Sequence, residues 1–207
     1  MQLIGMLDSP YVRRVAVSLR LLGIAFEHRP VSVFRHFDTF AAINPLVKAP
    51  TLVADDGTVL MDSTLILDHL PALTGTPLPR ALMPTDSAAC RQALRVLGLA
   101  LAACEKTVQT VYEHQLRPPE KLHAPWLDRV QGQLAAAYAA LEAELARTPL
   151  AADAAHITQA GITTAVAWGF TQMMLPGVVP ATAHPHLAAH AEAAERLAAF
   201  AEYPANG

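Results

Sequence analysis

The chain has few of the features that mark secreted, membrane or nucleic-acid-binding proteins. It contains only two cysteines, Cys90 and Cys104. If both lie on one helix they stand about 21 Å apart, which is too far for a disulfide. The longest apolar run, from Val96 to Cys104, is much shorter than the roughly 20 residues of a membrane span. Because the net charge is −3, no basic surface points to nucleic acid. We therefore expect neither a membrane nor a nucleic-acid partner.

Signals for export, phosphate binding and metal binding are lacking too. The start of the chain has neither the basic residues nor the long apolar stretch of a signal peptide. Scarce cysteine fits a reducing compartment, so we expect a cytoplasmic protein. There is no glycine-rich phosphate loop. The histidines His184, His186 and His190 suggest a metal site, but Pro185 breaks their helical spacing. No carboxylate or cysteine spacing supports a ligand set, so we expect no metal.

What the chain does have is a change of pattern near residue 78. Before it, short apolar runs alternate with helical spacing. The expected strands are 3–6, 25–33, 51–53 and 59–61, and the expected helices are 10–22, 34–43 and 63–73. A βαβ unit followed by a hairpin and a helix gives a mixed four-stranded sheet with helices on its faces. The order βαβαββα predicts an α/β domain over residues 1–78.

The rest of the chain is alanine-rich and helical. Proline and glycine between Pro71 and Pro84, including Gly75, Pro77 and Pro79, mark a linker, which we place at residues 79–86. After it, apolar residues at steps of three and four predict a helical bundle over 87–207, with long seams at 94–115 and 127–145. Thr158 is expected to cap a further helix, and Ile157 with Ile162 to form an apolar staple across its start. A last amphipathic helix is expected over 186–200.

The first stretch that carries chemistry is Asp8-Ser9-Pro10. Proline suits the first position of a helix, and Ser9 then falls at the N-cap. A hydroxyl there lies beside unpaired N–H groups and the positive end of the helix dipole, so it can stabilise an anion or a thiolate. An ordinary helix cap explains the same residues. One turn later, Arg13 either adds positive potential or forms an outward salt bridge.

Two further stretches carry chemistry. A cis bond at Ala49-Pro50, just before a strand, would turn the N–H and C=O of Ala49 outward, where an extended peptide can pair with them. A trans proline that begins a strand is the alternative. At the start of the helix over 63–73, Ser63 would offer its hydroxyl and N–H to a carboxylate, and Asp62 would hold an ammonium. Together they suit the end of an α-amino acid, although Asp62 as a simple helix cap explains the pattern equally well.

These stretches, in this order, resemble the glutathione transferases over almost the whole chain. The matching residues are Ser9-Pro10-Tyr11-Val12-Arg13, Asn44-Pro45, Lys48-Ala49-Pro50 and Asp62-Ser63 in the first half, and Tyr112-Glu113, Arg117-Pro118, Trp126 and Ile157-Thr158 in the second. The second-half residues other than Ile157-Thr158 resemble a bacterial branch of the family. The resemblance implies a thioredoxin-like, glutathione-binding domain over 1–78 and an all-helical C-terminal domain over 87–207.

The resemblance also implies a role for each site residue. Ser9 would be catalytic, donating a hydrogen bond to the glutathione sulfur. Ala49 would bind the cysteinyl backbone, with Pro50 as the cis proline. Asp62 and Ser63 would form the γ-glutamyl site. No cysteine stands near position 9, which argues against the branches of the family that use a cysteine nucleophile.

The contact of the glycyl carboxylate has several candidates, and two positions depart from the family pattern. Lys48 is the expected contact of the glycyl carboxylate, although Arg35 or His36 could share that work. Val47 replaces a usual glycine and restricts its loop. Gly161 replaces a usual aspartate, which leaves the capping box after Thr158 half complete.

The implied function is that of a cytoplasmic glutathione S-transferase in detoxification. It would bind glutathione as co-substrate, activate the thiol as thiolate and conjugate it to small, largely apolar electrophiles. A catalytically weak glutathione-binding protein that acts through protein contacts is one alternative, and a glutathione-dependent isomerase or dehalogenase is another. The resemblance also implies a homodimer. Candidate residues for the second substrate, between the domains, are Leu7, Tyr11, Glu105, Val108, Tyr112 and Trp168.

Overall fold

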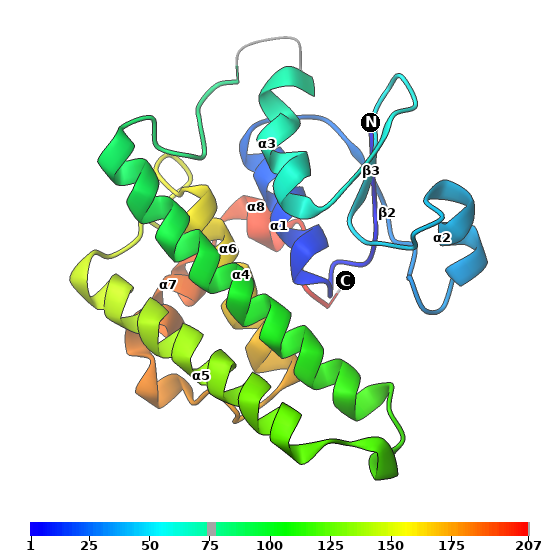
Figure 1. The fold of residues 1–207 in the computed structure, drawn as a ribbon. Helices are drawn as coiled ribbons and strands as arrows, with labels where there is room; N and C mark the ends of the chain where they lie inside the picture. The colour runs from blue at the N-terminus through cyan, green and yellow to red at the C-terminus, as the bar shows by residue number, and fades with distance from the viewer. Residues whose placement is uncertain (74–77, 207) are drawn as a thin grey trace. The chain divides into compact units, whose positions relative to one another are not determined.

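The computed structural model describes residues 1–73 and 78–206, and the chain forms two compact units (Figure 1). One unit comprises Met1–Leu82 together with Ala198–Gly207, and the other is Met83–Leu197. Residues 74–77, which end the predicted first domain, lie outside the described residues. The division into 1–78, 79–86 and 87–207 stays a prediction. Within the described ranges, no helix has both the length and the hydropathy to cross a bilayer.

The first unit is built on a mixed four-stranded sheet. Its strands are β1 (Gln2–Ile4), β2 (Glu27–Arg29), β3 (Thr51–Val53) and β4 (Val59–Met61), in the order β2-β1-β3-β4. β1 runs parallel to β2 and antiparallel to β3, and β3 and β4 form an antiparallel hairpin. The predicted sheet and its hairpin are therefore confirmed. The strand expected over 25–33 is shorter, because only Glu27–Arg29 pairs with β1.

Three helices join and flank these strands: α1 (Pro10–Leu21), α2 (Phe37–Ile43) and α3 (Ser63–Leu73). α1 is buried without a break from Val12 to Leu19, so its neighbouring arginines Arg13 and Arg14 have no solvent-facing side. A short last helix, α8 (Ala198–Ala201), packs against α1.

Arg13 connects α1 to the end of the chain. Its Nε donates to the carbonyl oxygen of Tyr203 at 2.8 Å, and its guanidinium carbon lies 5.5 Å from the ring centre of Phe200. The side chain is buried. The outward salt bridge that we considered from the sequence is therefore wrong, since Arg13 points into the unit and satisfies backbone carbonyls there.

The second unit is helical, which confirms the predicted fold class. Its helices are α4 (Ser87–Gln115), α5 (Ala124–Arg147), α6 (Gln159–Met174) and α7 (Pro185–Glu195), with short 3₁₀ helices at Pro119–Lys121 and Ala181–Ala183. α4 packs along α5 and α6, and α6 packs against α7 (Figure 1). The predicted α5 seam is buried from Val130 to Leu145. In the α4 seam Leu97 and Cys104 are buried, but Leu94 is 53% exposed.

The start of α6 matches the expected cap. The hydroxyl oxygen of Thr158 accepts the N–H of Gly161 at 3.3 Å, and Ile157 and Ile162 are both fully buried. A Cβ at Gly161 would lie 3.1 Å from Ile157 Cγ1 and 3.5 Å from the His190 ring. Tight packing therefore explains why glycine replaces the aspartate of a complete capping box.

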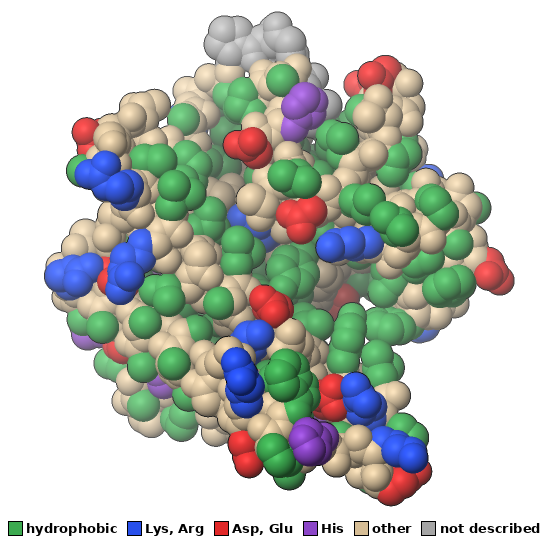
Figure 2. Space-filling model, viewed as in Figure 1, with side chains coloured by type: hydrophobic (Ala, Val, Ile, Leu, Met, Phe, Trp, Pro, Cys, Tyr) green, Lys and Arg blue, Asp and Glu red, His purple; other side chains and the backbone are tan. Residues whose placement is uncertain are grey.

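Charged side chains of both signs are scattered over one face of the molecule (Figure 2). On the face shown in Figure 2, Lys and Arg lie interspersed with Asp and Glu. This mixture agrees with a net charge of −3.

The start of α7 is capped by a side chain from α5. One carboxylate oxygen of Glu142 accepts the backbone N–H of His186 at 2.9 Å and contacts its Nδ1 at 2.7 Å, and the other accepts the N–H of Leu187 at 3.0 Å. Burial opposes ionisation of this carboxyl, but the hydrogen bonds from His186 and Leu187 outweigh burial and lower the pKa of Glu142.

We expect Glu142→Gln to lower the free energy of unfolding at pH 7 by about 1–2 kcal/mol, since it weakens a charged cap. Because the folded-state pKa lies below the unfolded value of 4.5, this contribution is present above pH 4.5 and disappears as the pH falls through the folded-state pKa. Urea titrations at pH 7 and pH 3 should show the difference between variant and wild type shrinking in acid. Glu192→Gln, on the exposed side of α7, is the control and should have little effect at either pH.

Candidate active site

Three segments meet at one edge of the sheet in the first unit. The register pairs Ile4 with Thr51 and Thr51 with Met61, so the ends of β1 and β4 lie beside the start of β3. The turn into α1 follows β1, Ala49-Pro50 precedes β3, and α3 follows β4 directly. The predicted residues Ser9, Ala49, Pro50, Asp62 and Ser63 therefore lie at this edge, which is the carboxyl end of β1. Ligands in open α/β sheets bind at such ends.

Ser9 occupies the N-cap position of α1, as predicted. Its backbone is extended, with φ −75° and ψ 121°, and Pro10 begins the helix. The hydroxyl makes no capping hydrogen bond to the helix, so an ordinary cap does not describe this side chain. The residue is half-buried. Its hydroxyl can therefore donate to a ligand at the helix N-terminus without breaking a bond to the helix.

The peptide bond between Ala49 and Pro50 is cis, which confirms that expectation. Close packing surrounds it. Gly5 follows β1 with φ +140°, and a Cβ there would lie 2.6 Å from Val12 Cγ2 and 3.1 Å from Ala49 Cβ. Only glycine fits both the backbone angle and the space. This close approach sets the spacing between β1, α1 and the cis-proline segment.

The loop before the cis proline is held by Asn44, whose role the sequence analysis missed. Its side chain is buried, and its Nδ2 donates to the hydroxyl oxygen of Thr51 at 2.9 Å, while its Oδ1 accepts the N–H of Leu46 at 3.0 Å. The Thr51 hydroxyl donates to the carbonyl of Lys48 at 2.7 Å. These bonds fix the backbone on both sides of Ala49-Pro50. The Lys48 side chain itself is exposed.

Val47 has the restricted backbone that the missing glycine suggested. Its φ is +48°, in the left-handed region. A β-branched residue is strained there.

Replacing Val47 by glycine should raise the free energy of unfolding by about 1 kcal/mol. The gain is the strain released, less the extra freedom that glycine has in the unfolded chain. A guanidinium unfolding curve would measure it. Val59→Gly is the control, since Val59 lies in a regular strand and its loss should destabilise. An unchanged or lower midpoint for Val47→Gly would show that the left-handed backbone stores no strain.

Asp62 and Ser63 begin α3 with distinct partners. Asp62 has φ +68°, and its Oδ1 accepts the N–H of Thr64 at 2.9 Å, so it does cap the helix. Ser63 is buried, and its Oγ accepts a hydrogen bond from Nη1 of Arg14 at 3.0 Å. The same Nη1 donates to the hydroxyl oxygen of Thr64 at 3.2 Å. Sequence reasoning missed Arg14. A signal existed, because Arg13 and Arg14 are the only charged residues in the apolar stretch 12–19.

The candidates for the glycyl carboxylate make no side-chain bond to the described residues at this edge. Arg35 and His36 are exposed and lie in the turn before α2, where Nδ1 of His36 accepts the N–H of Ser32 at 3.2 Å. The backbone places Lys48 next to Ala49. Within the parts of the chain that the structure describes, no hydrogen bond connects the side chains of Arg35, His36 or Lys48 to Ser9 or Ser63.

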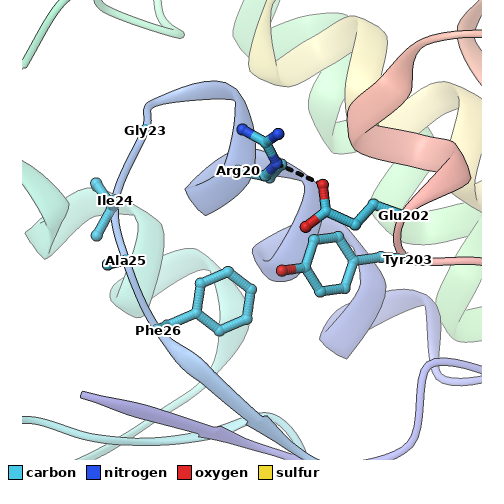
Figure 3. Close-up of a pocket in the computed structure, with 7 residues that line it drawn as sticks. All are labelled: Arg20, Gly23, Ile24, Ala25, Phe26, Glu202 and Tyr203. Carbon is cyan, nitrogen blue, oxygen red and sulfur yellow. Dashed lines mark hydrogen bonds and ion pairs between the residues drawn. The ribbon is translucent and has the colours of Figure 1, made fainter.

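A pocket of about 260 Å³ lies at the opposite end of α1 from Ser9 (Figure 3). Arg20 and Glu202 form an ion pair at 2.5 Å beside it, and the rings of Phe26 and Tyr203 stack with centroids 5.4 Å apart. Pro10 and Arg20 are separated by about 15 Å along the helix axis. This pocket is therefore separate from the edge that carries Ser9, Ala49 and Ser63.

Candidates in the second unit have structural partners. Trp168 is 5% exposed, and its ring meets that of Tyr138 edge-on with centroids 5.5 Å apart, which favours core packing. His186 bonds to Glu142, and Nε2 of His190 contacts the carbonyl of Gly161 at 3.0 Å. Among the residues described, no cluster of three or more His, Cys, Asp or Glu is arranged to hold a metal.

The arrangement of the first unit defines a class. A parallel β1–β2 pair joined through α1, an antiparallel hairpin and a cis proline before β3 make a thioredoxin-like domain, and a helical unit accompanies it. Residues 3–77 match the family profile described as "Glutathione S-transferase, N-terminal domain". The chain is 32% identical to a glutathione transferase family member from Pseudomonas fluorescens Pf-5, whose crystal structure holds glutathione. That match covers 98% of this chain and 97% of the other, with a TM-score of 0.81. The chain therefore belongs to the glutathione transferase family.

Other relatives agree. The same Pseudomonas protein was also crystallised with S-(propanoic acid)-glutathione. A glutathione S-transferase from Methylobacterium radiotolerans, in complex with glutathione sulfonate, is 26% identical over 98% of this chain and 93% of that one, with a TM-score of 0.85. The uncharacterized GST-like protein YibF of Escherichia coli (strain K12) is 27% identical over 177 residues, which is 86% of each chain.

Proposed function

We propose that this protein binds glutathione at the edge formed by Ser9, Ala49-Pro50 and Asp62-Ser63 and transfers it to small, largely apolar electrophiles. The observation that carries the proposal is the Ser9 hydroxyl, which lies at the N-terminus of α1 without a capping bond to that helix. A cis proline and a second helix N-terminus lie at the same edge. The glutathione bound by one relative and the glutathione sulfonate bound by another support this ligand.

Each part of glutathione has a chemically suitable partner in the proposal. The N–H and C=O of Ala49 pair with the cysteinyl backbone as an added strand does. Ser63 and the N-terminus of α3 hold the γ-glutamyl carboxylate, and Asp62 holds the ammonium. Lys48, exposed on the loop before Ala49, binds the glycyl carboxylate.

Ser9 acts on the ionisation of the sulfur. A thiol with an ordinary pKa of about 8.5 is only about 3% thiolate at pH 7. A hydroxyl donor and a helix N-terminus favour the charged form, and lowering the pKa by about two units corresponds to roughly 2.7 kcal/mol. The thiolate electron pair then forms the bond to an electrophilic carbon. A leaving group departs with its own pair, or an activated alkene takes a proton from water.

Conjugation is favoured over the other glutathione chemistries by one observation. A relative at 32% identity was crystallised with S-(propanoic acid)-glutathione, whose name places the substituent on the sulfur. Conjugation of glutathione to an electrophilic carbon forms a carbon–sulfur bond of this kind. Isomerisation and dehalogenation use the same thiolate, and a binding protein without turnover would keep the same contacts.

The test combines calorimetry with turnover. Titration with glutathione should show one site per chain, and an activated aryl chloride should be converted to its thioether in a glutathione-dependent reaction. Absence of glutathione binding would overturn the proposal. Binding without turnover across a panel of aryl halides, activated alkenes and epoxides would favour the binding protein, and isomerised product without a conjugate would favour the isomerase.

We also propose a cytoplasmic homodimer that serves detoxification. Several large apolar side chains of the first unit are exposed and suit a protein interface; they are Phe34, Phe37, Leu46, Val59 and Leu65. Sedimentation at micromolar concentration should give about twice the chain mass of 22.1 kDa. A single species at the chain mass would contradict the dimer.

A further inference from the structure

Arg14 is a buried charge next to the proposed γ-glutamyl site. It is 1% exposed and has the largest volume among the fully buried side chains of the described residues. Its Nη1 reaches both hydroxyls at the start of α3, 3.0 Å from Ser63 Oγ and 3.2 Å from Thr64 Oγ1. Burying a guanidinium is costly unless it gains strong hydrogen bonds. Its placement at this helix start therefore calls for an explanation beyond packing.

The hydrogen bond from Arg14 fixes how the Ser63 hydroxyl is used. A guanidinium has donors and no acceptor, so Ser63 Oγ must accept from it. The hydroxyl proton of Ser63 is then left to donate elsewhere. Among the described residues, no acceptor lies within hydrogen-bond distance of that proton. A hydroxyl polarised by a charged donor is also a stronger donor itself. Ser63 is therefore held as a hydrogen-bond donor.

The positive charges near the Ser63 hydroxyl favour an anionic ligand. The guanidinium of Arg14 and the N-terminal dipole of α3 are both positive, and both lie at Ser63. Asp62, whose Oδ1 accepts the N–H of Thr64, supplies a negative charge at the start of this helix. A zwitterionic α-amino acid end matches this pair of opposite charges.

We propose that Arg14 is a positioning residue that sets the selectivity of the site for the free α-carboxylate of the γ-glutamyl group, acting through the Ser63 hydroxyl. The inference rests on the proposed function, since it concerns the same glutathione. It differs from a purely structural role because it predicts a change in ligand preference, beyond any loss of stability.

Arg13 provides a matched control within the same helix. It is buried like Arg14, but it donates to the carbonyl of Tyr203 and lies against the ring of Phe200. Removing either guanidinium deprives α1 of a buried cation. Only the Arg14 change affects Ser63.

The test compares two ligands by calorimetry: glutathione, and glutathione whose γ-glutamyl α-carboxylate is amidated. Wild type should bind glutathione at least 30-fold more tightly. Arg14→Gln should reduce this ratio to about threefold, and Arg14→Lys should restore part of it, because lysine keeps the charge but not the planar fork. Arg13→Gln should keep the wild-type ratio. With an aryl chloride, Arg14→Gln should raise the KM for glutathione about 10-fold and change kcat less than twofold.

Different results separate this inference from the proposed function. If wild type binds neither ligand, glutathione binding itself fails, and this inference fails with it. If wild type binds both ligands equally, or if Arg14→Lys and Arg14→Gln keep the full ratio, Arg14 does not set selectivity, although glutathione binding stands. Thermal unfolding checks that each variant is folded. If Arg14→Gln does not fold, the wild-type ratio and the ratio in Arg14→Lys still decide the question.

Discussion

Replacing Ser9 by alanine is expected to lower kcat/KM for glutathione conjugation roughly threefold at pH 7, because a thiolate fraction about 25 times smaller is offset about eightfold by the higher nucleophilicity of a more basic thiolate. If the thiol pKa returns from about 6.5 to its ordinary value of about 8.5, the thiolate fraction falls from roughly three quarters to about 3%. The more basic thiolate is intrinsically a better nucleophile, which offsets part of the loss. The deficit should therefore shrink above pH 9, where both enzymes hold ionised sulfur.

Stability separates this effect from a folding defect. The Ser9 hydroxyl makes no capping bond to α1, so Ser9→Ala should change the free energy of unfolding by less than about 0.5 kcal/mol. Ser9→Thr keeps a hydroxyl and should retain most of the activity. The measurement is a pH profile of kcat/KM from pH 5.5 to 9.5 for the three proteins. An unshifted profile for Ser9→Ala would assign thiolate stabilisation to another group.

The second large effect concerns stability. Gly5→Ala should lower the free energy of unfolding by about 3–4 kcal/mol. A φ of +140° is a conformation that L residues avoid, at a cost of about 1–3 kcal/mol. The added Cβ would also lie 2.6 Å from Val12 Cγ2, and such overpacking costs about 1–3 kcal/mol more. This is a large part of the 5–15 kcal/mol that holds a typical domain together.

Gly23→Ala distinguishes the two causes. Gly23 also has a positive φ, +68°, but a Cβ there would meet nothing within 4 Å. It should therefore cost only about 1–2 kcal/mol, the backbone part. Urea unfolding of both variants measures the difference. Equal losses at the two positions would mean that the contact of Gly5 with Val12 and Ala49 relaxes freely and does not set the spacing of the site.

Features that depend on neighbouring residues were predictable from the sequence. Ser9-Pro10 marks the start of α1, the turn over 55–57 marks the β3–β4 hairpin, and Thr158 marks the start of α6, because in each case the residues that decide the structure are adjacent in the chain. Pro50 directly before a strand allowed a cis bond to be considered. The family resemblance then predicted that these separate stretches form one site.

Features that depend on distant partners were not predictable in this way. Arg14 reaches Ser63, 49 residues away, and Arg13 reaches Tyr203, 190 residues away. Arginine in a helix is usually exposed to solvent. Hydrogen bonds to distant residues make the burial of Arg13 and Arg14 favourable. The missing capping bond of Ser9 and the loop-holding role of Asn44 likewise depend on side-chain directions, which the residue pattern does not encode. The exposure of Leu94 shows that periodicity identifies a seam but not its ends.

The bond from Arg13 to the carbonyl of Tyr203 bears on the order in which the protein is made. The strands and helices of the thioredoxin-like domain precede the helical unit in the chain, but Tyr203, whose carbonyl oxygen accepts from this buried guanidinium, follows that unit. Until Tyr203 is synthesised, the hydrogen bond from Arg13 Nε to this carbonyl cannot form. The thioredoxin-like domain is therefore completed only after the whole helical unit has been synthesised.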